Sequence, residues 1–198
     1  MTEEIIKYYP NGAIKEKKHL LEGRKHGEYL SYFSNGQIMA KIHYNRGKKN
    51  GPAVSYWSNG HIREKATFKN GKLEGPYVSY HENGHLWEEE CYKDGKLNGL
   101  YRRYYKSGEL REEENFNLGK FEGPYACYYK NGQIKEKGFF KNDKREGEYV
   151  SFYKNGQIKE KAFFVKGKLK GKFQSFNEEG AHIDDESLDD TDTGRTWT

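Results

Sequence analysis

The sequence predicts an all-β protein: an elongated antiparallel meander of 24-residue β-hairpin repeats that form a twisted single-sheet ribbon. Three observations lead to this fold class. Glycines recur every 24 residues along nearly the whole chain. Almost every copy carries Asn-Gly between two alternating stretches, which is a strong short-range signal for a β-hairpin. The apolar residues are mainly aromatic, with 17 Tyr and 11 Phe.

The glycine spacing defines the repeat. One series runs at 24-residue steps from Gly12 to Gly180, and two further series begin at Gly23 and Gly27. Nearly all of the 23 glycines belong to these series, and Asp143 fills the one empty place in the second series. A strict period of this length is typical of a repeat array in which each copy packs on its neighbours.

The copies divide the chain into an array and a tail. Seven full repeats cover residues 8–175, preceded by a half repeat at 3–7 and followed by a degenerate capping repeat at 176–183. We therefore expect a single array over residues 1–183. Residues 184–198 hold six acidic residues and one arginine, and such a composition predicts a disordered, solvated tail.

The Asn-Gly pair predicts a two-residue type I′ turn, in which both central residues have positive φ. With residues 107–108 as one central pair, Tyr105 is expected to face Leu110, and Arg103 to face Glu112. The stretch between the second and third glycines of a copy predicts a longer return loop. The more apolar face of this hairpin would carry Gly99, Tyr101, Arg103, Tyr105, Leu110, Glu112, Glu114 and Phe116.

Composition limits the class of protein. Only 33% of the residues are hydrophobic and 33% are charged, which suits a thin sheet better than a deep core. The first residues lack the apolar run of a secretion signal, and no stretch approaches the roughly 18 apolar residues of a membrane span. Two cysteines make no disulfide framework. We expect a cytoplasmic protein.

The copies at residues 128–151 and 152–175 read Tyr/Phe-Tyr-Lys-Asn-Gly-Gln-Ile-Lys-Glu-Lys, followed by aromatic and glycine-rich segments. This pattern resembles the MORN repeat in its bacterial variant form, over residues 8–176. Proteins built almost wholly of this variant resemble the YwqK family of antitoxins from bacterial toxin–antitoxin systems. The resemblance implies an elongated antiparallel sheet and a toxin as partner, and it brings no catalytic residues.

Candidate catalytic and metal-binding residues are absent from the pattern. His19 and His43 occupy the same place in successive copies, so they are expected about 10 Å apart, too far to share one metal ion. Cys91 and Cys127 belong to different hairpins, so no disulfide is expected. No nucleophile–base arrangement or phosphate loop emerges, so we expect no catalytic residues, no metal, no cofactor and no enzyme activity.

The middle of the array is where the copies differ most. The second strands of repeats 4 and 5 carry Glu-rich segments, and the strand between them carries Arg102 and Arg103. One interpretation is a self-compensating cross-strand ion ladder. The other is a partner-specific patch that also includes Glu113, with Trp87 as its aromatic anchor, because Trp and Arg are enriched at interaction hot spots.

A row of aromatic or imidazole rings is the second candidate surface. The second residue of each copy supplies one ring, and the row could be a binding stripe or simply the covering of the sheet. Its candidate members are Trp57, His81, Tyr105, Tyr129 and Tyr153.

These observations predict a non-catalytic protein-binding array, an antitoxin or immunity protein that neutralises its cognate toxin by direct contact. The alternative is a scaffold or a peripheral protein on anionic membranes, with lipid as a secondary partner. Nucleic acid is not expected as a partner, because Lys alternates with Glu in most second strands and weakens any basic field. The pattern leaves the oligomeric state open.

Overall fold

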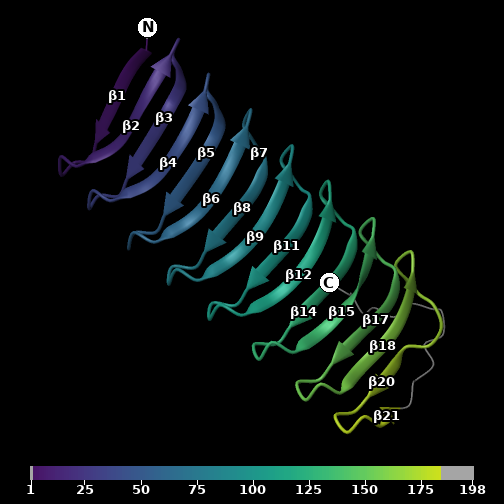
Figure 1. Ribbon diagram of the computed structural model, residues 1–198. Helices are drawn as coiled ribbons and strands as arrows, with labels where there is room; N and C mark the ends of the chain where they lie inside the picture. Colours follow the sequence, from purple (N-terminus) through teal and green to yellow (C-terminus); the bar gives the residue numbers. More distant parts are fainter. Residues whose placement is uncertain (1, 184–198) are drawn as a thin grey trace. The chain divides into compact units, whose positions relative to one another are not determined.

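The computed structural model describes residues 2–183 (Figure 1). They contain 21 β-strands and no helix, which confirms the all-β prediction. Clustering of contacts divides the chain into an N-terminal unit that ends at Lys120 and a C-terminal unit that begins at Phe121. The acidic tail predicted at residues 184–198 lies outside the described residues.

The N-terminal unit is an antiparallel meander in which each long strand pairs with the next one along the chain. Its strands are β1 (Thr2–Tyr8), β2 (Ile14–Leu21), β3 (Arg24–Tyr32), β4 (Ile38–Asn45), β5 (Lys48–Tyr56), β6 (Ile62–Lys69), β7 (Lys72–Leu73), β8 (Gly75–Tyr80), β9 (Leu86–Lys93), β10 (Lys96–Leu97), β11 (Gly99–Tyr104) and β12 (Leu110–Asn117).

The C-terminal unit repeats the same pattern of antiparallel hairpins. The short strand β13 (Lys120–Phe121) spans the boundary between the units. The remaining strands are β14 (Gly123–Tyr128), β15 (Ile134–Lys141), β16 (Lys144–Arg145), β17 (Gly147–Phe152), β18 (Ile158–Val165), β19 (Lys168–Leu169), β20 (Gln174–Phe176) and β21 (His182–Ile183).

The turn at the Asn-Gly near the start of each copy, such as Asn59-Gly60, differs from the predicted type I′ turn. In the third copy, the Trp57 backbone N–H donates to the His61 carbonyl (2.8 Å), and the Gly60 N–H donates to the Trp57 carbonyl (2.9 Å). Gly60 has a φ of 86°, whereas Asn59 is not among the residues with positive φ. This is a three-residue loop, a type I turn followed by one left-handed glycine that forms a β-bulge.

The bulge corrects the predicted register near the turn. Leu110 pairs with Tyr104 rather than with Tyr105, and the shift occurs between Arg103 and Tyr104. Deeper in the hairpin, Arg103 pairs with Glu112 as predicted. The three-residue loop moves the pairing by one residue, and the extra residue Arg111, between Leu110 and Glu112, restores the predicted register. Only the pairs next to the loop are therefore misplaced.

The asparagine of the turn has a different role from the predicted one. Asn59 Oδ1 accepts a hydrogen bond from the His61 backbone N–H (3.0 Å), and Asn59 Nδ2 donates to the Glu82 carbonyl of the next copy (2.9 Å). Asn83 and Asn155 make the equivalent pair of bonds. The side-chain amide therefore stabilises the local turn and joins it to the next repeat.

Type I′ turns occur instead at the other end of the hairpins, where a longer return loop was predicted. Asn70 and Gly71 both have positive φ, 51° and 88°, and they connect strands that pair directly before and after them. In the sixth copy Asn142 and Asp143 adopt φ of 48° and 64°. Asp tolerates this left-handed conformation better than most residues, which explains how it replaces the periodic glycine.

Side chains pack mainly on one face of each unit, which we call the ring face. In the N-terminal unit Tyr101 contacts Phe116 edge-on, with ring centroids 5.9 Å apart. This contact confirms the predicted more apolar face for Tyr101 and Phe116, whereas the predicted pairing of Tyr105 with Leu110 is wrong. In the C-terminal unit the buried cluster on this face consists of Tyr125, Tyr149, Ala162, Phe164 and Phe173.

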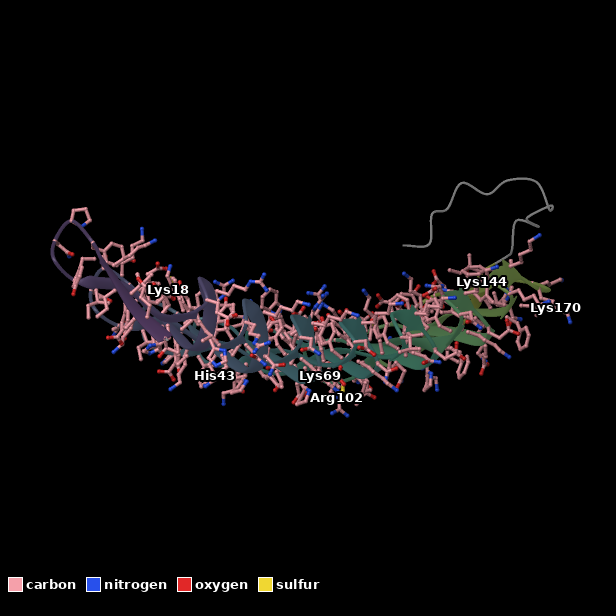
Figure 2. The ribbon with its side chains drawn as sticks, turned by 90° about the horizontal axis from the view of Figure 1, so that it is seen from above. Lys18, His43, Lys69, Arg102, Lys144 and Lys170 are labelled. Atoms are coloured by element: carbon pink, nitrogen blue, oxygen red, sulfur yellow. The ribbon has the colours of Figure 1, made fainter. Side chains whose placement is uncertain are left out.

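The opposite face, called the lysine face, carries a recurring lysine in the second strand of most copies, at Lys17, Lys41, Lys65, Lys137 and Lys161. Figure 2 shows the two faces of the N-terminal unit: Lys18 lies on the ring face, whereas His43, Lys69 and Arg102 point to the lysine face. Side-chain alternation along each strand produces this separation.

Gly138, which lies outside the periodic glycine series, is held in place by ring packing. A Cβ atom built there would lie 2.7 Å from Tyr125 Cε1, and the Tyr125 ring is itself packed against Phe140. We expect Gly138→Ala to destabilise the protein by about 1–3 kcal/mol through overpacking, measured by urea unfolding. Ala162→Gly, at the equivalent place in the next copy, is the matched comparison. Unchanged or increased stability of Gly138→Ala would contradict this account.

Candidate interaction surface

The ring face of repeats 4 and 5 contains an ion network around Arg103. Its Nε lies 3.0 Å from Glu88 Oε1, and its Nη1 lies 2.9 Å from Glu112 Oε1. Both carboxylates are largely buried, with side chains 14% and 17% exposed. Tyr101 donates a further hydrogen bond to Glu88 (3.3 Å). The predicted placement of Arg103 between these two glutamates is confirmed.

On the lysine face, Arg102 forms a second ion pair. Its register partners are Glu89 and Glu113, as the sequence predicted, and its Nε lies 2.7 Å from Glu113 Oε2. Glu89 accepts a hydrogen bond from the Tyr104 hydroxyl (2.6 Å). Burial, followed by this bond, raises the pKa of Tyr104 to about 12. Arg102, Glu113, Glu89 and Tyr104 therefore form cross-strand pairs within the sheet, and these pairs exist whether or not a partner binds this surface.

Two further carboxylates set the central repeats apart. Glu90 and Glu114 occupy the place where other copies carry Ala66 or Ala162. Burial raises the pKa of Glu114 to about 7; Glu112 adds to this shift and Arg103 opposes it. Burial also raises the pKa of Glu90, although the hydrogen bond from Tyr92 opposes the shift. The Glu-rich segments are visible in the sequence, but the burial of Glu90 and Glu114 follows only from packing in the sheet.

Most members of the predicted ring row connect one repeat to the next. Trp57 Nε1 donates to the Tyr80 carbonyl (3.1 Å). The Tyr129 and Tyr153 hydroxyls each donate, at 2.8 Å, to the carbonyl that lies 23 residues further along the chain. These rings are partly buried and hydrogen-bonded within the chain, which supports the sheet-covering interpretation for them.

Cationic side chains cover several of these rings. The covering residue is the eighth of each copy, six residues after the ring. Arg63 lies over Trp57 at 5.1 Å, and Arg111 lies over Tyr105 at 5.9 Å, measured from the guanidinium carbon to the ring centroid. Lys159 lies over Tyr153 in the same way. A cation above an aromatic face is a favourable arrangement at a surface.

The fourth repeat reverses this arrangement. Here the ring position holds His81 and the covering position holds Trp87, and the two rings stack with centroids 5.7 Å apart. His81 Nε2 is buried and has no hydrogen-bond partner within the described residues. Trp87 is 41% exposed. Of the predicted candidates, Trp87 is therefore the one whose aromatic surface is most clearly presented to solvent.

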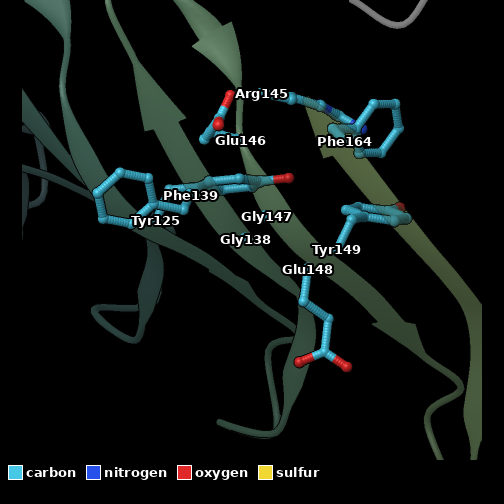
Figure 3. Close-up of a pocket in the computed structure, with 9 residues that line it drawn as sticks. All are labelled: Tyr125, Gly138, Phe139, Arg145, Glu146, Gly147, Glu148, Tyr149 and Phe164. Carbon is cyan, nitrogen blue, oxygen red and sulfur yellow. The ribbon is translucent and has the colours of Figure 1, made fainter. Parts of the chain in front are cut away.

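Residues 2–183 contain no group of His, Cys, Asp and Glu suited to a metal ion, and none of their segments forms a helix that could cross a membrane. Figure 3 shows a crevice of the C-terminal unit between Tyr125 and Tyr149. The rings fill it so closely that it holds essentially no free volume. Neither Cys91 nor Cys127 forms a disulfide.

The raised pKa of Glu114 predicts pH-dependent stability. The folded state binds the proton of the Glu114 carboxyl more tightly than the unfolded state does. Protonation of Glu114 therefore stabilises the fold increasingly as the pH falls from about 7 towards 4.5. We expect Glu114→Ala to be more stable than the native protein at pH 8, with a smaller stability gain on acidification to pH 5. Urea unfolding at both pH values measures this, with Glu82→Ala as control. Identical pH profiles for the native protein and Glu114→Ala would refute it.

The hydrogen bond of Trp57 predicts a stabilising role for the ring row. Trp57→Phe keeps an aromatic ring, as Phe33 does in the preceding copy, but removes the donor to the Tyr80 carbonyl. We expect a loss of about 1 kcal/mol in the free energy of unfolding. Phe33→Tyr, which introduces a hydroxyl at the equivalent place, is the reciprocal variant. A Trp57→Phe protein as stable as the native one would show that the bond contributes nothing.

The chain matches a known repeat family. The MORN repeat variant matches six successive segments, residues 25–46, 49–70, 73–94, 97–118, 121–142 and 145–166. No curated protein matches the chain.

Several solved structures are similar to this chain over a small part of their own length. The crystal structure of TcdB2–TccC3–Cdc42 has 11% identity and a TM-score of 0.22, and the match covers 88% of this chain and 13% of that one. The Photorhabdus luminescens Tc holotoxin pore has 12% identity and a TM-score of 0.20, with 87% and 13% covered. This chain thus spans a small part of the length of those chains. The six tandem matches show that the protein belongs to the MORN repeat variant family, whose repeats indicate a repeat protein that binds proteins or membranes.

Proposed function

We propose that this chain is a non-catalytic antitoxin or immunity protein, which acts in the bacterial cytoplasm and neutralises a toxin by direct contact. The observation that carries the proposal is the break in the repeat pattern between Trp87 and Glu114. A repeat array expresses partner specificity where its copies differ, and this segment combines an exposed tryptophan with an unusual charge pattern. The resemblance to the YwqK antitoxins supports the choice of a toxin as partner.

The chemistry of the segment supports binding rather than catalysis. Arg103 is engaged by Glu88 and Glu112, and Arg102 is engaged by Glu113. Groups held in mutual ion pairs are poorly placed to act on a substrate, whereas they keep a surface rigid and pre-organised for a partner. Trp87, which precedes Glu88 in the chain, stacks on His81 and keeps 41% of its surface exposed as an apolar anchor.

A copurification experiment tests the proposal. The tagged protein is expressed in its native host, and the partners that it retains are identified. We expect a toxin whose activity is inhibited at equimolar antitoxin, and whose gene lies beside this one. Recovery of no toxin, together with no toxin gene in the neighbourhood, would refute the antitoxin role.

A consensus variant tests whether the ion network is structural or part of the interface. Arg102→Val, Arg103→Ser, Glu89→Lys and Glu113→Lys restore the residues that other copies carry at these places. We expect the quadruple variant to fold, as judged by circular dichroism and urea unfolding, and to retain toxin binding, because the pairs compensate one another within the sheet. Lost binding with intact folding would instead place the interface on this network.

A second candidate function, binding to anionic membranes, is favoured by the lysine face of the C-terminal unit. Phe139 and Phe163 are 41% and 48% exposed, and Lys137 and Lys161 lie on the same face. Exposed aromatic rings among lysines are typical of surfaces that lie on anionic lipid. Co-sedimentation with phosphatidylserine vesicles that falls with added salt, and that is lost in Phe139→Thr/Phe163→Thr, would support it. No binding to such vesicles would exclude it.

A further inference from the structure

We propose that Arg63, Trp87 and Arg111 form a docking row for an acidic polyproline II segment of a protein partner. In this segment an aromatic side chain would lie midway between two acidic side chains, each three residues away from it. The inference rests on the proposed protein-binding function and specifies the partner chemistry that the central repeats would recognise.

The three residues are aligned across the sheet of the N-terminal unit. Glu64, Ser79, Glu88, Arg103 and Glu112 pair in succession across β6, β8, β9, β11 and β12. Each member of the row precedes one of these paired glutamates by one residue, on every second strand. Because neighbouring strands lie about 4.8 Å apart, successive members of the row are spaced by roughly 9.6 Å.

The row presents one aromatic surface between two cations. Trp87 has one ring face stacked on His81, and 41% of its surface remains exposed. Arg63 and Arg111 are exposed, and the rings beneath them hold their guanidinium groups in place. Arg63 also contacts Glu64 at 3.2 Å. The first two copies carry Lys15 and Met39 at the equivalent place, so they do not present an aromatic ring between two cations.

The spacing selects the conformation of the bound segment. A polyproline II helix rises about 3.1 Å per residue with three residues per turn, so residues i and i+3 lie on one side about 9.3 Å apart. In an extended strand these two residues point to opposite faces, and in an α-helix they lie only about 4.5 Å apart along the axis. Polyproline II therefore matches the interval of the row, with its residues on one side.

Charge and ring chemistry select the side chains of the segment. Carboxylates are the natural partners of Arg63 and Arg111, because a guanidinium offers planar pairs of donors. An aromatic ring between these carboxylates can stack on the open face of Trp87, in the offset arrangement that aromatic pairs prefer. The row would thus recognise the pattern acid, two residues, aromatic, two residues, acid.

Fluorescence anisotropy with a labelled synthetic peptide tests the inference. The probe contains Glu-Pro-Pro-Tyr-Pro-Pro-Glu, and the full chain is titrated into it at low salt. We expect saturable binding that weakens about tenfold or more with Trp87→Lys, and similarly with Arg63→Met/Arg111→Met. The introduced residues are those of Lys135 and Met39 at the equivalent places, so the fold should tolerate them. Lys15→Met, which makes the same kind of change outside the row, should bind like the native protein.

Altered peptides test the geometry. A peptide with Gln in place of both Glu residues, and one with three prolines on each side of the tyrosine, are expected to bind about tenfold or more weakly. Equal binding of the altered peptides would overturn the inference. Equal binding of the peptide by Trp87→Lys would also overturn it. A third contradicting result would be that a single-stranded DNA probe, oligothymidylate, binds through Trp87 while the peptide does not bind.

The outcomes separate this inference from the proposed function. If the toxin is recovered and its binding does not depend on Trp87, the antitoxin role stands and the docking row is refuted. If the peptide binds through the row but no toxin is recovered, the docking row stands and the antitoxin role fails.

Discussion

Left-handed backbone at the two turns of every repeat sets the register on which the rest of the structure depends. One turn needs a single glycine in this conformation, such as Gly60, and the other needs two such residues, such as Asn70 and Gly71. Because side chains alternate along a strand, a shift of one residue would exchange the ring face and the lysine face. Packing, ion pairs and candidate surfaces all follow from these turns.

A sheet with its packing on one face has little room to bury apolar surface. The protein compensates with large rings, such as the Tyr101–Phe116 pair, and with hydrogen bonds from side chains to the backbone of the next repeat. Polar groups therefore enter the packed face as well. Arg103 shares this face with Glu88 and Glu112, and Glu114 has a pKa of about 7 because it is buried there. The central repeats combine structural ion pairs with the exposed ring of Trp87.

The sequence predicted the features that depend on period and alternation alone. These were the 24-residue hairpin repeat, the all-β class, the more apolar face, and the placement of Arg103 between Glu88 and Glu112. It misassigned the two turns, because Asn-Gly is compatible with more than one loop and the choice depends on a bulge. The resulting register error reached only the residues beside the loop, Tyr105 and Leu110.

The sequence by itself thus determined the repeat and the face on which most side chains lie, because period-2 geometry is local to each strand. Tertiary structure alone decided which rings are used within the sheet and which are presented. Trp57 and Trp87 are both candidate binding residues in the sequence, yet one donates to the next repeat and the other stacks on His81 and stays 41% exposed. The physical reason is that these contacts join residues from neighbouring strands or across a bulged loop, whose positions follow only from the assembled sheet.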